Sequence, residues 1–254
     1  MNSFPKFEKL FNTRDLGGLP AAGGKAVRGG MLVRSGCLAP ATATDCEALA
    51  ALVSDVVDLR TERERAETPD PELGGVAAVS LPVLASLTPG VTREAGAERR
   101  ALDRIKSGDA ESARRYMCAL YRGLVTDPFC LSQYAKFLRM AAAARPRALL
   151  WHCSAGKDRA GVAAILVEKL LGVAEEAIRA DYLASNEHLE PEVLARLARP
   201  DVPAPIRYLY TVRAEYYDAL NEALARAGGF DAFAESGLGV TKAARGRLRE
   251  RYLA

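Results

Sequence analysis

The stretch "ALLWHCSAGKDRAG", residues 148–161, decides the fold of this chain. Residues 148–151 form a short apolar run of the kind found in buried strands, and a polar loop follows it directly. The loop leads into "AGVAAILVEKLLG", residues 160–172, which predicts an apolar helix closed by Gly172. A strand, a tight loop and a helix in this order predict a cradle for an anion at the helix N-terminus.

The loop also holds residue types that phosphate chemistry requires. Cys153 and Arg159 stand in a C-x5-R relation, which is weak evidence alone because this chain is rich in Arg. A phosphate-binding loop of this kind also requires a strand before it and a helix after it, and the sequence predicts both. We therefore predict that the phosphate would be bound by Ser154, Ala155, Gly156, Lys157, Asp158 and Arg159.

Cys153 would lie at the floor of this cradle. The amides and the guanidinium that bind phosphate would also stabilise a thiolate and so supply a nucleophile at neutral pH. His152 is interpreted as a buried residue that fixes the cysteine through a backbone hydrogen bond rather than as a general base. The predicted reaction is in-line attack of sulfur on phosphorus, followed by hydrolysis of a phosphocysteine, with no metal and no cofactor.

Periodicity in the first half of the chain indicates short strands separated by turns. We expect strands within residues 26–36, 54–60 and 74–83. A helix is expected over Asp45–Val53, with Thr44 as N-cap and Glu47 completing a capping box.

The second half is predicted to be mainly helical. Apolar residues between Ala113 and Leu124 recur at helical spacing, and a second helix is expected over residues 131–144, ended by Pro146. Further helices are expected over residues 175–186 and 206–229, separated by a rigid proline-rich corner at 199–205. Residues 1–254 are predicted to form a single domain.

Residues 85–110 are polar and carry no clear periodicity. They are typical either of a solvated loop or of a mobile lid over the site, and the full insertion would span residues 85–125.

Composition excludes several classes of function. A net charge of +3 on 254 residues argues against nucleic-acid binding. The five cysteines form no C-x-x-C pair, which argues against a disulfide framework or a zinc site and favours a reduced, cytoplasmic setting. No apolar run reaches 18 residues, so membrane integration is not expected, and the first fifteen residues lack the pattern of a secretory signal. The oligomeric state is left open.

"HCSAGKDRAG", residues 152–161, resembles the H-C-x5-R loop of the cysteine-dependent protein tyrosine phosphatases. "FNTRDLGGLP", residues 11–20, resembles the N-terminal segment of the bacterial tyrosine-serine phosphatase family, which includes secreted mycobacterial and listerial enzymes. "LVRSG" (32–36), "VVDLRTERE" (56–64) and "DYLASN" (181–186) follow in that family's order.

The resemblance implies an α/β fold class of the phosphotyrosine-phosphatase type, a mainly parallel central sheet flanked by helices, with a lid-like helical insertion in some members. It implies hydrolysis of phosphotyrosine, phosphoserine or phosphothreonine, and in some members of phosphoinositides. Lys157 would add positive charge for a multiply anionic headgroup, or else lie solvated at the rim. The alternative function is a phosphate-binding module of the same fold that turns over slowly or not at all.

The leaving oxygen needs a proton from a carboxyl group. Asp158, inside the loop, is the favoured general acid, and Asp58, at the end of a predicted strand, is the other candidate or a structural partner of Arg60. Arg14 and Asp15 are expected to shape a turn, to pair with each other or to support the loop.

The sequence departs from the resembled pattern at Ala160, where Ser or Thr is usual. That hydroxyl ordinarily stabilises the sulfur as a leaving group, so its absence predicts slow breakdown of the intermediate.

Overall fold

The computed structural model describes residues 4–85, 88, 91–92, 109–143 and 145–254. The strands are β1 (Arg14–Asp15), β2 (Leu32–Ser35), β3 (Val53–Asp58), β4 (Ala77–Ser80) and β5 (Ala148–His152). The first helices are η1 (Ala22–Gly24), α1 (Ala43–Leu52), α2 (Glu62–Glu67), α4 (Ala110–Leu124), α5 (Pro128–Ala142) and α6 (Arg159–Leu171). The later helices are α7 (Glu175–Ala184), α8 (Pro191–Leu197), α9 (Ala204–Tyr210), α10 (Ala214–Arg226), α11 (Phe230–Ser236) and α12 (Lys242–Tyr252).

The strands of the described residues form one sheet in the order β1-β2-β5-β3-β4. β1 pairs with β2 in antiparallel fashion, and every other neighbouring pair is parallel. β5, the apolar run that precedes the cysteine, therefore lies between β2 and β3 and is buried along its whole length. This mainly parallel sheet with flanking helices confirms the predicted α/β fold class.

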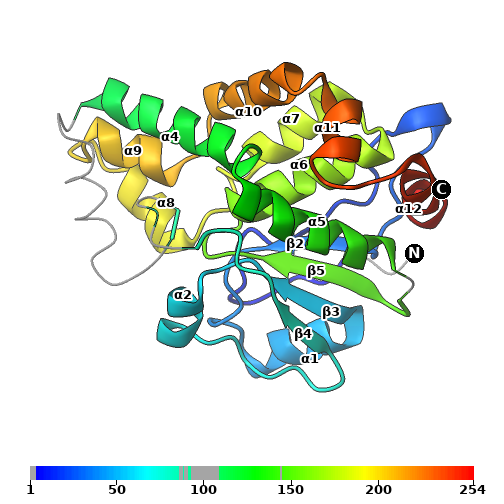
Figure 1. Ribbon diagram of the computed structural model, residues 1–254. Coiled ribbons are helices and arrows are strands. Elements are labelled where there is room, and N and C mark those ends of the chain that lie inside the picture. The colour runs from blue at the N-terminus through cyan, green and yellow to red at the C-terminus, as the bar shows by residue number, and fades with distance from the viewer. Residues whose placement is uncertain (1–3, 86–87, 89–90, 93–108, 144) are drawn as a thin grey trace.

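Side chains of β5 alternate between two apolar layers, as the pleat of a strand requires. Leu149 and Trp151 face the larger layer, which α5 and α6 cover, and Leu150 faces the smaller one, which packs on α1 through Leu49. Figure 1 shows α1 on one side of the sheet and α5 and α6 on the other. Because both faces of β5 are covered, an uninterrupted apolar run was required there.

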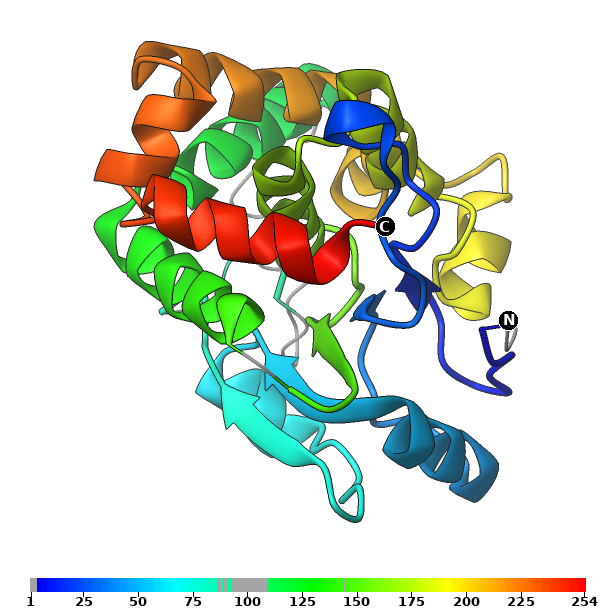
Figure 2. The same cartoon turned by 90° about the vertical axis from the view of Figure 1, so that its right-hand side faces the viewer.

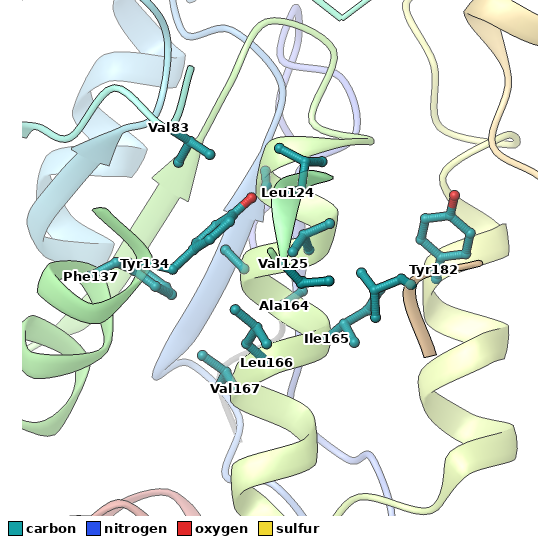
Figure 3. Close-up of a cluster of buried hydrophobic side chains, with 14 of the residues drawn as sticks. Val83, Leu124, Val125, Tyr134, Phe137, Ala164, Ile165, Leu166, Val167 and Tyr182 are labelled. Carbon is teal, nitrogen blue, oxygen red and sulfur yellow. The ribbon is translucent and has the colours of Figure 1, made fainter. Parts of the chain in front are cut away.

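Helix α6 is the centre of the larger layer. Figure 3 shows Leu166 and Val167 on α6, with Tyr134 and Phe137 on one side and Tyr182 on the other. Helix α12 also packs against α5 and α6 (Figure 2). Gly172 ends α6 in the left-handed conformation with φ 78°, as the sequence predicted. Helix α6 is thus held from several sides, which fixes the loop at its N-terminus.

Four elements in the first half, one helix and three strands, have bounds that differ from the expected ones. Helix α1 begins at Ala43 with Thr42 as N-cap, and Asp45 completes the capping box, so the prediction from Thr44 and Glu47 was wrong. Asp45 also accepts hydrogen bonds from the amides of Glu8 and Lys9, a tertiary contact that favours this register.

The strands are shorter than predicted. Of residues 26–36 only Leu32–Ser35 form β2, because Gly30 turns the chain with φ 70°. The predicted strands at 54–60 and 74–83 become Val53–Asp58 and Ala77–Ser80.

In the second half, α4 and α5 confirm the two predicted helices, although α5 begins earlier, at Pro128, behind the N-cap Asp127. The single helix predicted over residues 206–229 was wrong. It is divided into α9 and α10 by an extended break at Thr211–Arg213, where Asn186 exchanges two hydrogen bonds with the backbone of Val212.

The possible lid spans residues 85–125, of which 86–87, 89–90 and 93–108 lie outside the described residues. Its described end is α4, which packs against α9 and α10. Closure of a mobile lid stays a prediction. None of the described helices is long and apolar enough to cross a membrane.

Candidate active site

Three neighbouring parallel strands end at the same level of the sheet. The last residues of β2 and β3, Ser35 and Asp58, both pair in register with His152 at the end of β5. The carboxyl ends of parallel strands are where open α/β sheets bind ligands. Cys153 follows β5 at this edge, so the sheet topology brings the predicted nucleophile to the expected place.

The cysteine loop, residues 153–159, turns sharply between β5 and α6. Gly156 has φ 71°, and a Cβ there would come within 2.7 Å of the amide nitrogen of Gly36. Only glycine satisfies both the conformation and the close approach. Cys153 is 2% exposed, and helix α6 begins at Arg159.

Arg159 is fully buried and held by a carboxylate from α2. Its Nη1 and Nη2 donate to Oε2 and Oε1 of Glu64 at 2.6 and 2.9 Å, which is a bidentate pair. Burial lowers the pKa of a guanidinium, but Glu64 outweighs this and holds the pKa of Arg159 above its ordinary value. Nη2 also donates to the hydroxyl of Ser154 and to the carbonyl of Val91. A residue of the stretch 85–125 therefore contacts the cysteine loop.

Lys157 is not solvated, as one of the two interpretations had it, because it is only 2% exposed. Its ammonium group donates to the Asp158 carboxylate at 2.7 Å and to the Leu209 carbonyl at 3.0 Å. The other carboxylate oxygen of Asp158 accepts a hydrogen bond from Tyr121 of α4 at 2.7 Å. The charges of Lys157 and Asp158 thus compensate each other inside the protein.

Asp58 belongs to a second charge cluster behind the loop. Its Oδ2 lies 2.7 Å from Nη2 of Arg60, which also contacts Asp70 at 2.7 Å. His152 Nε2 lies 3.0 Å from Asp70, while its Nδ1 is 3.4 Å from the Cys153 carbonyl. Burial raises the pKa of the Asp58 carboxyl, but His152 and Arg60 outweigh it and lower this pKa to about 2.

The same cluster contains the donor set most suited to a metal ion among the described residues. Ligand atoms of Asp58, Asp70 and His152 lie within 4.8 Å of one another. Arg60, however, contacts both carboxylates and already compensates their charge. The donor set therefore fits an ion pair network better than a cation site.

Arg14 and Asp15 do not pair with each other. Arg14 donates to Asp181 of α7 and to the side-chain oxygen of Asn12, and Asp15 accepts from the amides of Gly17 and Gly30. Arg14 thereby supports the environment of the loop, while Asp15 shapes a turn.

Sequence reasoning did not identify several residues that contact the loop. Asn12, Arg34, Glu64 and Tyr121 contact it directly, and Asp181 acts on it through Arg34. All but Tyr121 lie in the stretches "FNTRDLGGLP", "LVRSG", "VVDLRTERE" and "DYLASN", so the motifs themselves carried the available signal.

A cavity of about 340 Å³ opens beside the loop. Ser154 and Glu64 line it together with Phe11, Cys37 and Glu190. The site therefore combines a tight loop at a helix N-terminus, a fixed guanidinium and an adjoining space for the rest of a substrate.

Comparisons with known proteins agree with this geometry. The model of the tyrosine phosphatase family matches residues 5–254. A Cupriavidus necator protein named "Putative tyrosine-protein phosphatase" is 37% identical over 257 residues, covering 98% of this chain and 88% of its own. The "Triple specificity protein phosphatase PtpB" of Mycobacterium tuberculosis is 30% identical over 159 residues, covering 58% of this chain and 56% of its own. The chain therefore belongs to the tyrosine phosphatase family and is, as a member of it, a phosphatase.

Proposed function

We propose that the chain hydrolyses phosphomonoesters on proteins through a phosphocysteine intermediate. The observation that carries the proposal is the bidentate Glu64–Arg159 pair, which fixes a guanidinium in the loop that also holds Cys153. A guanidinium fixed in this way holds its positive charge beside a transferring phosphoryl group, and its Nε, which has no hydrogen-bond partner among the described residues, can donate to a phosphoryl oxygen.

The proposed reaction has two displacements at phosphorus. The Cys153 thiolate forms the S–P bond while the P–O bond to the substrate breaks, and the leaving oxygen takes a proton from a carboxyl group. Water then attacks phosphorus while the carboxylate takes a proton from it, the S–P bond breaks, and phosphate leaves with the thiolate and the carboxyl group restored. His152 and Asp58 stand behind the loop and support its position rather than react.

The substrates proposed are phosphotyrosine and the shorter phosphoserine and phosphothreonine, with phosphoinositides as a further class. The relative from M. tuberculosis is named a triple-specificity enzyme, which supports a broad range. The buried Lys157 already pairs with Asp158, which weakens the argument that it serves a multiply anionic headgroup.

A panel of phosphotyrosine, phosphoserine and phosphothreonine peptides and a soluble phosphoinositide, assayed with and without EDTA, tests the proposal. We expect hydrolysis of at least one peptide class that EDTA does not change. Activity that disappears with EDTA would contradict the mechanism. Phosphate binding without turnover on any substrate would favour the alternative, a binding module.

For the general acid we propose Asp158 rather than Asp58. A pKa of about 2 leaves Asp58 ionised at neutral pH, with no proton to donate. Asp158 belongs to the loop that would hold the phosphate, directly before Arg159, whereas Asp58 lies behind that loop against His152. Tyr121 and Lys157 orient its two oxygens.

Replacing Asp158 by Asn is expected to lower kcat by about 10²- to 10⁴-fold for a substrate with a poor leaving group such as phosphoserine. The loss should be much smaller for p-nitrophenyl phosphate, because nitrophenolate leaves without a proton. Steady-state kinetics on both substrates give the ratio of the two kcat values, phosphoserine to p-nitrophenyl phosphate, for each variant. Asp58→Asn is the matched variant, and a ratio that changes in Asp58→Asn but not in Asp158→Asn would reverse the assignment.

The missing hydroxyl at position 160 is expected to make breakdown of the intermediate rate-limiting. Rapid-quench kinetics with p-nitrophenyl phosphate should give a burst of nitrophenol followed by a slow steady state. Ala160→Ser should raise the steady-state rate and reduce the burst. Ala160 is fully buried, so the melting temperature of the variant is the control. A wild-type progress curve without a burst would contradict the expectation.

A further inference from the structure

We propose that Asn12 and Arg34 are positioning residues that set the orientation of two peptide groups in the cysteine loop, so that the amides of Gly156 and Lys157 face a bound phosphate. The inference deepens the proposed function and rests on the same cradle. It gives a physical role to the "FNTRDLGGLP" and "LVRSG" stretches, which lie more than 100 residues before the loop.

Three consecutive carbonyl groups of the loop are bound from one side. The carbonyl of Ser154 accepts from the Cys37 amide at 3.1 Å. The carbonyl of Ala155 accepts from Asn12 Nδ2 at 2.9 Å, and that of Gly156 accepts from Arg34 Nη2 at 2.8 Å. All three donors come from residues 12–37, next to β2.

The orientation of these carbonyl groups also fixes the direction of the neighbouring amide groups. In a trans peptide the C=O and the following N–H point in opposite directions. Binding the carbonyls of residues 154–156 on the β2 side therefore directs the amides of Ala155, Gly156 and Lys157 to the other side of the loop. Among the hydrogen bonds that join described residues, none has one of these three amides as its donor. They form the concave set of donors that an anion requires.

The two donating side chains are themselves fixed. Asn12 is 2% exposed and has φ 52°, and Arg14 donates to its Oδ1, so its Nδ2 must face the carbonyl of Ala155. Arg34 is fully buried and pairs with Asp181 at 2.6 Å. Asp181 also binds Arg14, which in turn donates to Asn12. One carboxylate therefore orients Arg34 directly and Asn12 through Arg14.

Loss of either donor frees one carbonyl to rotate. A rotated peptide would present an oxygen instead of an N–H to the phosphate, which replaces attraction by repulsion. Asn12 controls the peptide between Ala155 and Gly156, and Arg34 controls the next one. Substitution of Asn12 should therefore affect the Gly156 amide, and substitution of Arg34 the Lys157 amide. A general loss of stability would affect both amides alike.

The test uses ¹⁵N-labelled full-length protein titrated with inorganic phosphate. In the wild type, the amide signals of Ala155, Gly156 and Lys157 are expected to move downfield on binding. In Asn12→Gly, which retains the positive φ, the Gly156 shift should be lost and the Lys157 shift kept. In Arg34→Lys the Lys157 shift should be lost and the Gly156 shift kept. Phosphate affinity, measured by calorimetry, should fall about tenfold or more in each variant.

Matched controls separate positioning from folding. Asn186→Gly removes a half-buried side-chain bridge to Val212, and Arg145→Lys alters an arginine whose side chain is 5% exposed and pairs with Asp55 in β3. Both should keep wild-type phosphate affinity and amide shifts.

Wild-type affinity in both folded variants, or loss of both amide shifts together in each, would overturn the inference. If neither variant folds, the wild-type titration decides: three downfield shifts uphold the inference, and an unmoved Gly156 or Lys157 amide overturns it. A wild type that binds phosphate with these shifts but hydrolyses no ester would refute the proposed function alone.

Discussion

Replacing Cys153 by Ser is expected to abolish hydrolysis while leaving phosphate binding intact. A serine hydroxyl is a far weaker nucleophile than a thiolate at neutral pH. The expected loss of kcat is on the order of 10⁴-fold or more, as for removal of other covalent nucleophiles. The backbone contacts that shape the loop, from Cys37, Asn12 and Arg34, do not involve the sulfur atom.

The measurement combines turnover of the best peptide in the panel with calorimetric titration of phosphate. Cys46→Ser is the matched control, because Cys46 is a half-buried thiol on α1, on the opposite face of the sheet from α6. It should retain wild-type turnover. Hydrolysis that survives Cys153→Ser would require another nucleophile and end the proposed mechanism.

The second large effect is expected at Arg159. Arg159→Ala removes the guanidinium that would stabilise the transferring phosphoryl group, and kcat/KM should fall by about 10³-fold or more, by analogy with arginines that act on phosphoryl transfer. The same change leaves Glu64 buried without its bidentate partner, which should lower the free energy of unfolding by about 3–5 kcal/mol. Urea unfolding and steady-state kinetics measure the two effects.

A double variant separates them. Glu64→Gln combined with Arg159→Ala removes the uncompensated charge, so stability should be largely restored while activity stays lost. Arg179→Ala is the control, because Arg179 and Asp218 form an exposed pair whose loss should cost less than about 1 kcal/mol. Recovery of activity in the double variant would show that Arg159 serves only to balance Glu64.

The local pattern predicted much of the fold. β5 and α6 were predicted from an apolar run, a glycine-containing loop and a second apolar run. Such signals are local, because hydrophobic periodicity and turn residues determine structure within a few positions of the chain. Boundaries were less well predicted where distant residues compete. Thr42 and Thr44 both offer caps for α1, and the contact of Asp45 with the backbone of Glu8 and Lys9 favours the first.

The sequence by itself determined the fold class, the cysteine loop with Cys153 and Arg159, and the family, since these depend on residues that are close together along the chain. Only the tertiary structure decided which groups complete the site. Glu64 meets Arg159 across 95 positions, Asn12 meets Ala155 across 143, and Asp58 lies against His152. The physical reason is that such pairs form only when parallel strands end at one edge of a sheet, and their energies depend on burial, which no local spacing specifies.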